Sequence, residues 1–265
     1  MSSKAKKLDA FGKLLDIMDK LRAECPWDKK QTFLSLRNLT IEETFELGDA
    51  ILGGDLMEIK KELGDMLLHI VFYSKLGSEK GAFDIADVAE GICEKLIFRH
   101  PHIYGDVKVK DESEVKKNWE ILKLKEGKKT TLGGVPKGLP TLIKAQRIQE
   151  KAAGVGFDWE TNEQVLQKVK EELNELQIEV EKGNKIKIEE EFGDVIFSLI
   201  NYARFLKVNP DIALENTNKK FIERFNFIEN KAKYLGKQLN EMSLSEMESL
   251  WVQAKNYTSS DETSS

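Results

Sequence analysis

The sequence predicts an all-α fold in which one helical domain occurs twice in tandem. Apolar residues recur at spacings of three and four along most of the chain, the pattern of helices that bury one face. Val, Ile and Thr do not alternate with polar residues over any strand-length run. One acidic pattern also recurs in both halves with the same internal spacing, which indicates a duplication.

The acidic pattern consists of a Glu-Glu-x-x-Glu triplet followed by a Glu-x-x-Asp pair. Its copies are residues 42–46 with 62–65, and residues 171–175 with 191–194. In both copies 19 positions separate the second Glu of the triplet from the Glu of the pair, and the copies lie 129 positions apart. Residues three apart share a helix face, so two such helices facing each other would bring four carboxylates together.

The first half is predicted to form a series of helical segments. Their apolar stripes span residues 11–21, 36–51, 59–76, 85–98 and 114–124. Asp28 or Thr32 is predicted to cap the second segment. Gly53-Gly54 is predicted to end that segment, and Pro101 to end the fourth.

A segment rich in Gly, Pro and Lys, residues 126–140, is predicted to link two domains. The N-terminal domain would comprise residues 1–125 and the C-terminal domain residues 141–257. In the second domain a helix over 142–152, a break at 154–159, two acidic helices around Gly183-Asn184 and a helix over 214–228 repeat the order of the first. The polar tail, residues 258–265, is predicted to be disordered.

Charge and cysteine content narrow the class of protein. The 265 residues include 46 acidic and 41 basic side chains, so the net charge of -5 argues against nucleic acid as the main partner. Cys25 and Cys93 are too few for a disulfide framework and lack zinc-site spacing, which favours a reducing compartment. The chain has neither an apolar signal core nor an apolar run of about 18 residues, so it is predicted to be cytoplasmic, without a membrane span.

The carboxylates have two possible interpretations. Solvated helix faces are the simpler one, because 33% of the residues are charged. Against it, the pattern repeats, carries no interleaved Lys at i+4, and abuts a long apolar run in each copy. Like charges on a half-buried face need a neutralising partner, and a divalent cation is the natural one.

The donor types indicate which cation. All repeated ligands are oxygens, and the nearby His69 is replaced by Ser198 in the second copy, which favours Mg²⁺ or Mn²⁺ over zinc. Mg²⁺ usually binds through a few carboxylates together with substrate phosphates, so the ligand is expected to be phosphorylated. Two such ions would polarise a phosphate oxygen and supply a deprotonated water.

Basic and aromatic residues follow the carboxylates in both halves. Lys220 and Arg224 share a helix face suited to phosphate oxygens, Lys255 would add a third positive charge, and Trp251 would stack on a base. The first half has the counterparts Lys95, Arg99, Trp119 and Lys123. Taken singly, each is better explained as a solvated helix face or a core residue. The histidines are interpreted as structural: His69 as a packed core residue, His100 and His102 as helix-end residues.

Several motifs together resemble the MazG family of nucleoside triphosphate pyrophosphohydrolases. Besides the two acidic sets they are Cys25-Pro26-Trp27-Asp28-Lys29-Lys30-Gln31-Thr32, Arg99-His100-Pro101-His102, Lys144-Ala145-Gln146-Arg147-Ile148-Gln149 and Val155-Gly156-Phe157-Asp158-Trp159. The resemblance implies tandem MazG domains that hydrolyse nucleoside triphosphates of broad range to monophosphate and pyrophosphate with Mg²⁺. It also implies a homodimer whose helices assemble into four-helix bundles.

The resemblance further implies which residues form the site. In the C-terminal domain, taken as the main catalyst, the metal ligands would be Glu172, Glu175, Glu191 and Asp194. Substrate contacts would be Asn218, Lys220, Arg224, Trp251 and Lys255, with Lys220 and Arg224 stabilising phosphate charge during attack at the α-phosphorus. The first domain keeps the metal ligands Glu43, Glu46, Glu62 and Asp65, but Cys93 replaces Asn218.

Two alternatives remain open at this stage. One keeps the fold and narrows the substrate to a damaged or deoxynucleoside triphosphate, and the duplication weighs against it. The other is a non-catalytic helical nucleotide sensor or scaffold, and retention of the basic residues with all the carboxylates weighs against that.

Overall fold

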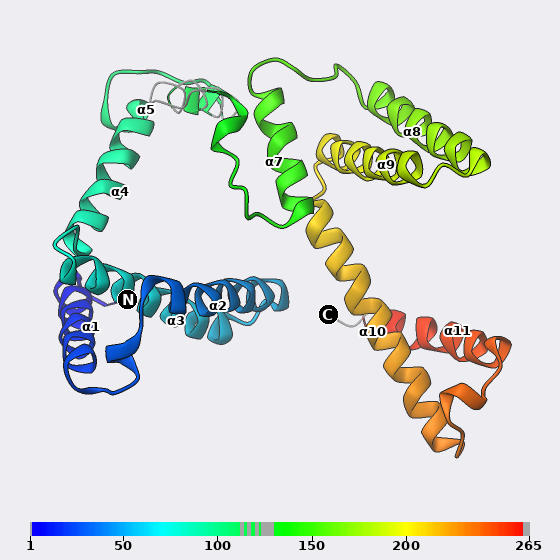
Figure 1. The fold of residues 1–265 in the computed structure, drawn as a ribbon, viewed down its shortest axis with the longest axis horizontal. Coiled ribbons are helices and arrows are strands. Elements are labelled where there is room, and N and C mark those ends of the chain that lie inside the picture. The colour runs from blue at the N-terminus through cyan, green and yellow to red at the C-terminus, as the bar shows by residue number, and fades with distance from the viewer. Residues whose placement is uncertain (1, 112–113, 116–117, 120–121, 123–129, 262–265) are drawn as a thin grey trace. The chain divides into compact units, whose positions relative to one another are not determined.

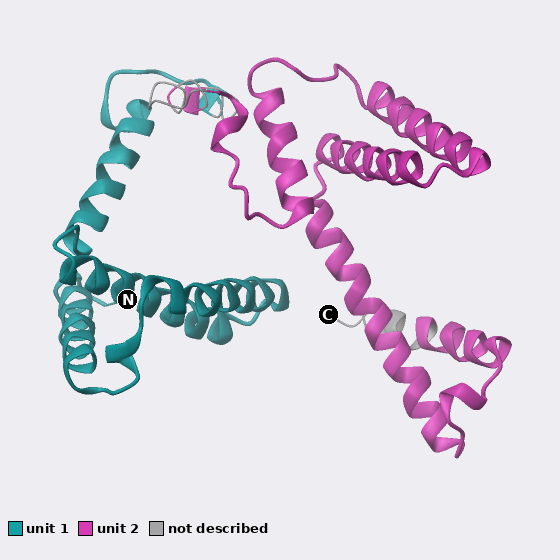
Figure 2. Ribbon diagram, in the orientation of Figure 1, with its two compact units in different colours: residues 1–115 teal, residues 116–265 magenta. Residues whose placement is uncertain are grey.

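The computed structural model describes residues 2–111, 114–115, 118–119, 122 and 130–261. These residues form helices and connecting turns without any β-strand, so the all-α prediction is confirmed for them. The chain divides into two units, residues 1–115 and 116–265 (Figure 2). The predicted linker boundary at residue 126 stays a prediction, because residues 123–129 lie outside the described part of the chain.

The first unit begins with a helix that packs against the helical hairpin following it (Figure 1). Its elements are α1 (Lys4–Glu24), η1 (Asp28–Lys30), α2 (Phe33–Gly53), α3 (Leu56–Glu79), α4 (Ile85–Arg99) and α5 (Pro101–Tyr104). Of the two predicted caps of α2, Asp28 and Thr32, the structure has Thr32, which forms a capping box with Ser35. Gly54 ends α2 with φ at +71°, a left-handed conformation that glycine adopts without strain, and Asp55 then caps α3.

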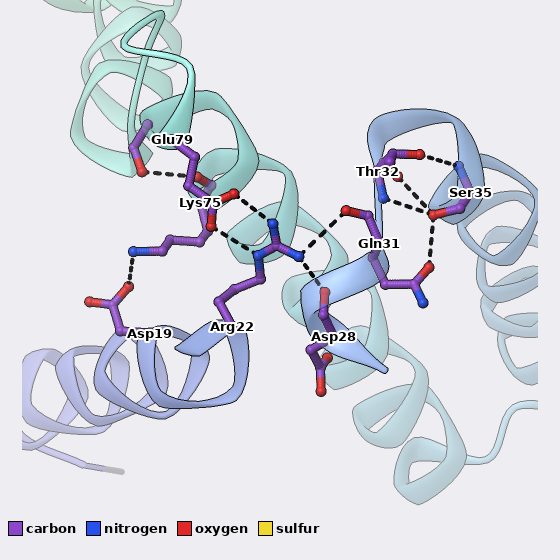
Figure 3. A network of polar contacts seen from close by, with 9 residues as sticks. Asp19, Arg22, Asp28, Gln31, Thr32, Ser35, Lys75 and Glu79 are labelled. Atoms are coloured by element: carbon purple, nitrogen blue, oxygen red, sulfur yellow. Dashed lines mark hydrogen bonds and ion pairs between the residues drawn. The ribbon is translucent and has the colours of Figure 1, made fainter. Parts of the chain in front are cut away.

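The core of the first unit lies where α1, α2 and α3 meet. Its buried residues are Met18, Leu36, Val71, Phe72 and Leu76. Beside this core, Arg22 of α1 donates two hydrogen bonds to the Glu79 carboxylate of α3, at 2.9 and 2.6 Å. Arg22 also donates to the carbonyl oxygens of Asp28 and Gln31, which ties η1 to both helices (Figure 3).

The second unit repeats the hairpin and follows it with a helix of 25 residues and a helix of 18. Its elements are η2 (Leu132–Gly134), α7 (Thr141–Ala153), α8 (Asn162–Lys182), α9 (Lys185–Phe205), α10 (Pro210–Tyr234), η3 (Leu239–Glu241) and α11 (Leu244–Asp261). Thr161 caps α8 and Gly183 ends it with φ at +70°, each 129 positions after its counterpart in the first hairpin. The predicted repeat therefore extends to the caps and the turn.

The helices after the hairpins differ from the prediction in length. α10 runs to Tyr234, six residues beyond the predicted end at Ile228, whereas Pro101 ends α4 at Arg99. Ala232 on this extension and Ile228 just before it pack with Met242 and Leu250, and this burial stabilises the added residues.

Predictions for residues 114–124 and for the C-terminal tail have mixed outcomes. Residues 114–115, 118–119 and 122 are helical as predicted, and the rest of the segment 112–129 lies outside the described residues. α11 continues to Asp261, so residues 258–261 of the predicted disordered tail are helical, while 262–265 lie outside the description. Among the described helices, none is both long and apolar enough to cross a membrane.

Candidate metal centres on the two acidic hairpins

The second hairpin gathers three carboxylates. Glu172 and Glu175 lie one turn apart on α8, and Glu191 faces them from α9. One carboxylate oxygen from each lies within 4.8 Å of the others, close enough to hold one metal ion. Asp194, one turn after Glu191, is exposed and is not part of this set of three.

The first hairpin gathers the counterpart residues. Oxygens of Glu43 and Glu46 on α2 and Glu62 on α3 also lie within 4.8 Å of one another. Asp65 is half-buried and, like Asp194, lies outside the set of three. The buried member differs between domains: it is Glu62 on α3 in the first and Glu172 on α8 in the second.

The electrostatics of both clusters are those of like charges held together. In the second domain, burial and then the carboxylates of Glu175 and Asp194 raise the pKa of Glu191. In the first, burial and then Asp65 raise the pKa of Glu43. Asp194 and Asp65 therefore lie near enough for their charges to raise the pKa of a glutamate in the neighbouring cluster. These shifts mean that the ionised clusters are destabilised without a nearby positive charge.

An unsatisfied oxygen supports the same conclusion. Oε2 of Glu62 is buried and has no hydrogen-bond partner among the described residues. A buried carboxylate oxygen is costly unless a donor or a cation reaches it. All the ligands are hard oxygen donors, so the residues present fit Mg²⁺ or Mn²⁺.

A lysine partially neutralises each buried glutamate. Nζ of Lys168 lies 2.8 Å from Oε1 of Glu172, and Nζ of Lys61 lies 2.8 Å from Oε1 of Glu62. Neither ion pair was predicted from the sequence, because only a lysine four positions after a carboxylate was considered. Lys168 stands four positions before Glu172 and Lys61 is adjacent to Glu62, so the signal was present in the spacing.

The predicted substrate contacts lie on α10 and α11. The Arg224 guanidinium carbon lies 5.7 Å from the Trp251 ring centroid, and Phe221 lies 5.0 Å from the same ring. Lys220, Asn218 and Lys255 are exposed. Figure 1 shows α10 running away from the α8–α9 hairpin that carries the carboxylates.

The first-domain counterparts are described in part. Lys95 and Cys93 are exposed, Arg99 and Trp119 are half-buried, and Lys123 lies outside the described residues. His69 and His100 lie where they were predicted to lie, and His102 lies in the last turn of α5. His69 is buried with Nδ1 2.9 Å from Oγ1 of Thr40, and His100 caps the C-terminus of α4.

The hairpins differ in one further respect that bears on function. In the second domain a cavity of about 170 Å³ adjoins the cluster, with Lys168, Glu172, Asp194, Ser198 and Asn201 in its wall. In the first domain, 129 positions earlier, three of these residues have larger or apolar counterparts. Leu39 corresponds to Lys168, His69 to Ser198 and Phe72 to Asn201. Phe72 belongs to the core of the first unit. The second domain thus has space for a ligand where the first has packed side chains.

The fold and these centres define a class of protein: an all-helical duplication with a candidate divalent-cation site on each acidic hairpin. The profile of the MazG nucleotide pyrophosphohydrolase domain matches residues 31–104 and 160–228. The chain belongs to the MazG nucleotide pyrophosphohydrolase family, as the motifs predicted.

Relatives resemble the chain over most of its length. The nucleoside triphosphate pyrophosphohydrolase of Escherichia coli (strain K12) is 39% identical over 94% of this chain and 98% of that protein. The nucleoside triphosphate pyrophosphohydrolase/pyrophosphatase MazG of Thermotoga maritima is 43% identical over 92% of this chain and 95% of its own length. The uncharacterized protein YabN of Bacillus subtilis (strain 168) is 46% identical over 92% of this chain and 51% of that protein.

Proposed function

We propose that the protein is a Mg²⁺-dependent nucleoside triphosphate pyrophosphohydrolase of broad substrate range. It would convert NTPs or dNTPs and water to monophosphates and pyrophosphate. The observation that carries the proposal is the carboxylate cluster of the second hairpin beside a cavity lined by Lys168, Glu172 and Asp194. The names of the Escherichia coli and Thermotoga maritima relatives support the reaction class.

The residues have separate roles in this proposal. Glu172, Glu175, Glu191 and Asp194 would hold Mg²⁺, which neutralises phosphate charge and lowers the pKa of a bound water when it is present. Lys220, Arg224 and Lys255 would contact the phosphates. Asn218 and Trp251 remain predicted contacts to the nucleoside. The first-domain set Glu43, Glu46, Glu62 and Asp65 is proposed to bind metal without the main catalytic role.

We also propose a cytoplasmic homodimer. Within one chain α10 runs away from the α8–α9 hairpin (Figure 1), so we propose that a second copy supplies or completes the site. Large apolar side chains remain exposed on the second hairpin, including Leu173, Phe192 and Leu199 at 49%, 55% and 47%. A hairpin with such faces is half of a four-helix bundle. Light scattering on the purified full chain would test the dimer, and a monomer at working concentration would contradict it.

Pyrophosphate release from a panel of NTPs and dNTPs tests the activity. Glu172→Ala is expected to lower kcat/KM by about 100-fold or more, because it removes a metal ligand worth several kcal/mol to the reaction. Glu43→Ala, the matched change in the first domain, is expected to retain most of the activity. Full activity of the Glu172 variant, or no Mg²⁺-dependent turnover by the unchanged chain, would overturn the proposal.

A further inference from the structure

The cavity beside the carboxylate cluster of the second hairpin is too small for a nucleotide. Its volume is about 170 Å³. Sites for small molecules usually measure about 300–1,000 Å³. One water takes about 30 Å³ of the liquid, so the cavity has room for several waters. Glu172 and Asp194 line it, and their carboxylates accept hydrogen bonds. The cavity is therefore suited to hold water next to the candidate metal ligands.

Asn201 lines this cavity from α9, and Arg204 fixes the direction of its amide. Nε of Arg204 donates to Oδ1 of Asn201 at 3.1 Å, and a second guanidinium nitrogen donates to the same oxygen at 2.8 Å. A guanidinium group has only donors, so the amide oxygen must face Arg204. The Nδ2 group is consequently turned away from Arg204.

The Nδ2 group of Asn201 is available to a molecule in the cavity. Within the described part of the chain it donates to no other group, and it is not one of the fully buried polar atoms that lack a partner. Other polar groups of the wall are already engaged. Lys168 pairs with Glu172, and the Ser198 hydroxyl donates to the carbonyl oxygen of Val195. Asn201 can therefore donate a hydrogen bond to water in the cavity.

Arg204 is itself anchored by Asp158, in the loop between α7 and α8. Two of its guanidinium nitrogens donate to the two Asp158 carboxylate oxygens, one of them at 2.8 Å. The side chains of Arg204 and Asp158 are only 19% and 25% exposed, so this bidentate pair is held more firmly than an ion pair in full contact with water. Asp158, Arg204 and Asn201 thus form a continuous chain of contacts from the loop to the cavity.

The first domain has different residues at the corresponding positions. Asn201 corresponds to the core residue Phe72, 129 positions earlier. Arg204 corresponds to Lys75, which pairs with Asp19 instead. The chain of contacts therefore accompanies the hairpin that has the cavity and is not a general feature of the duplicated fold.

We propose that Asn201 is a positioning residue for the metal site of the second domain. Its Nδ2 group donates to a water in the cavity, and that water donates to the carboxylates of Glu172 and Asp194. Arg204, anchored by Asp158, keeps the amide in this direction. Partners of this kind orient metal ligands and commonly contribute about 10- to 100-fold to metal affinity or activity. This role rests on the Mg²⁺ site of the proposed function and extends it to residues that would not touch the ion.

Metal affinity measured without nucleotide tests the role of Asn201. Mn²⁺ binding to the full chain would be followed by electron paramagnetic resonance in a Glu43→Ala background, which disables the first-domain set. Asn201→Leu keeps the approximate volume but not the amide, and is expected to weaken Mn²⁺ binding by about 10-fold. The Mg²⁺ concentration for half-maximal ATP hydrolysis is expected to rise by a similar factor. The KM for ATP at saturating Mg²⁺ is expected to change by less than about 2-fold, because the cavity is too small for a nucleotide.

A double variant tests whether Arg204 acts through Asn201. Arg204→Met alone is expected to weaken Mn²⁺ binding by about 3-fold or more, because it releases the amide. Arg204→Met combined with Asn201→Leu is expected to weaken it no more than Asn201→Leu alone. Arg22→Met is the matched control, because it removes a comparable bidentate pair with Glu79 in the first unit. It is expected to leave Mn²⁺ affinity unchanged. Losses that multiply in the double variant would overturn the role of Arg204.

The remaining outcomes separate this role from the proposed function. Unchanged Mn²⁺ affinity in Asn201→Leu would overturn the proposal, and so would a raised KM for ATP, since the cavity would then contact the nucleotide itself. If Asn201→Leu does not fold, equal Mn²⁺ affinities of Arg204→Met and Arg22→Met would overturn it. Failure of the unchanged chain to hydrolyse any triphosphate would instead overturn the proposed function, and the Mn²⁺ titration would still decide the role of Asn201.

Discussion

Nζ of Lys168 lies 2.8 Å from Oε1 of Glu172, one helical turn further along α8. The Glu172 side chain is 10% exposed and the Lys168 side chain 38%, so the pair is held partly out of water. The hydrogen bond to Glu172 is the largest influence that raises the pKa of Lys168. The second acidic hairpin therefore carries its own partial counter-charge, and a bound cation would supply the remainder.

Replacing Lys168 is expected to make the hairpin depend on metal. Lys168→Met leaves a buried carboxylate without its positive partner, and the free energy of unfolding in EDTA is expected to fall by about 1–2 kcal/mol. Saturating Mg²⁺ is expected to restore most of this loss, because a bound ion stabilises the folded state. Urea denaturation with and without Mg²⁺ measures both effects. Lys170→Met, at an exposed position on the same helix, is the control, and an equal loss in EDTA and Mg²⁺ would contradict the prediction.

Arg22 is expected to be the main polar determinant of stability in the first unit. Arg22→Met removes the bidentate hydrogen bonds to Glu79 and the bonds to two backbone carbonyls, and is expected to cost about 1–3 kcal/mol. Lys75→Met removes the neighbouring bond to Asp19, whose side chain is 63% exposed, and is expected to cost less than about 1 kcal/mol. Chemical denaturation of both variants provides the comparison, and similar losses would contradict the assigned role.

Gly77 is required by close packing in α3. A Cβ atom at this position would lie 2.7 Å from the Phe83 ring and 2.8 Å from the Phe83 carbonyl oxygen. Gly77→Ala is therefore expected to destabilise the first unit by about 1–3 kcal/mol through overpacking. Gly12→Ala, in α1 with nothing within 4 Å of the added carbon, is expected to stabilise it by about 0.5–1 kcal/mol. Thermal unfolding should show shifts of opposite sign.

Glu246 at the start of α11 is expected to make stability depend on acid pH. Its carboxylate accepts from the Ser243 backbone N–H at 2.8 Å and pairs with Lys237 at 2.6 Å. The hydrogen bond from Lys237, followed by the bonds from Ser243, lowers the pKa of Glu246 to about 2. A lowered pKa means that this stabilisation is complete above the ordinary pKa of 4.5 and is lost as the pH falls toward 2.

The Glu246 prediction is checked by urea denaturation at pH 6 and pH 3 with the unchanged chain and Glu246→Gln. The variant lacks the titrating carboxylate, so the difference in stability between the two proteins is expected to shrink at the lower pH. A constant difference would contradict the assignment. Titration of the Glu246 carboxyl resonance by NMR would give the pKa directly.

The local rules of helix formation made much of the fold predictable from the sequence. Thr32 and Gly54 determine where α2 begins and ends, and Thr161 and Gly183 do the same for α8, because caps and left-handed turns depend on residues close in the chain. The repeat spacing likewise indicated which glutamates would share a helix face. By contrast, the length of α10 depends on burial against α11, so its end at Tyr234 was not predicted.

The sequence by itself determined that this protein is an all-helical duplication carrying two sets of carboxylates, because helical periodicity and caps are local. Only the tertiary structure decided that Glu62 is buried in one domain and Glu172 in the other, since burial depends on what packs around each hairpin. It also decided that Gln149 of α7 would lie against Phe197 of α9, 48 positions away, with its Oε1 buried and without a hydrogen-bond partner among the described residues. Such contacts follow from long-range packing, which no local spacing in the sequence encodes.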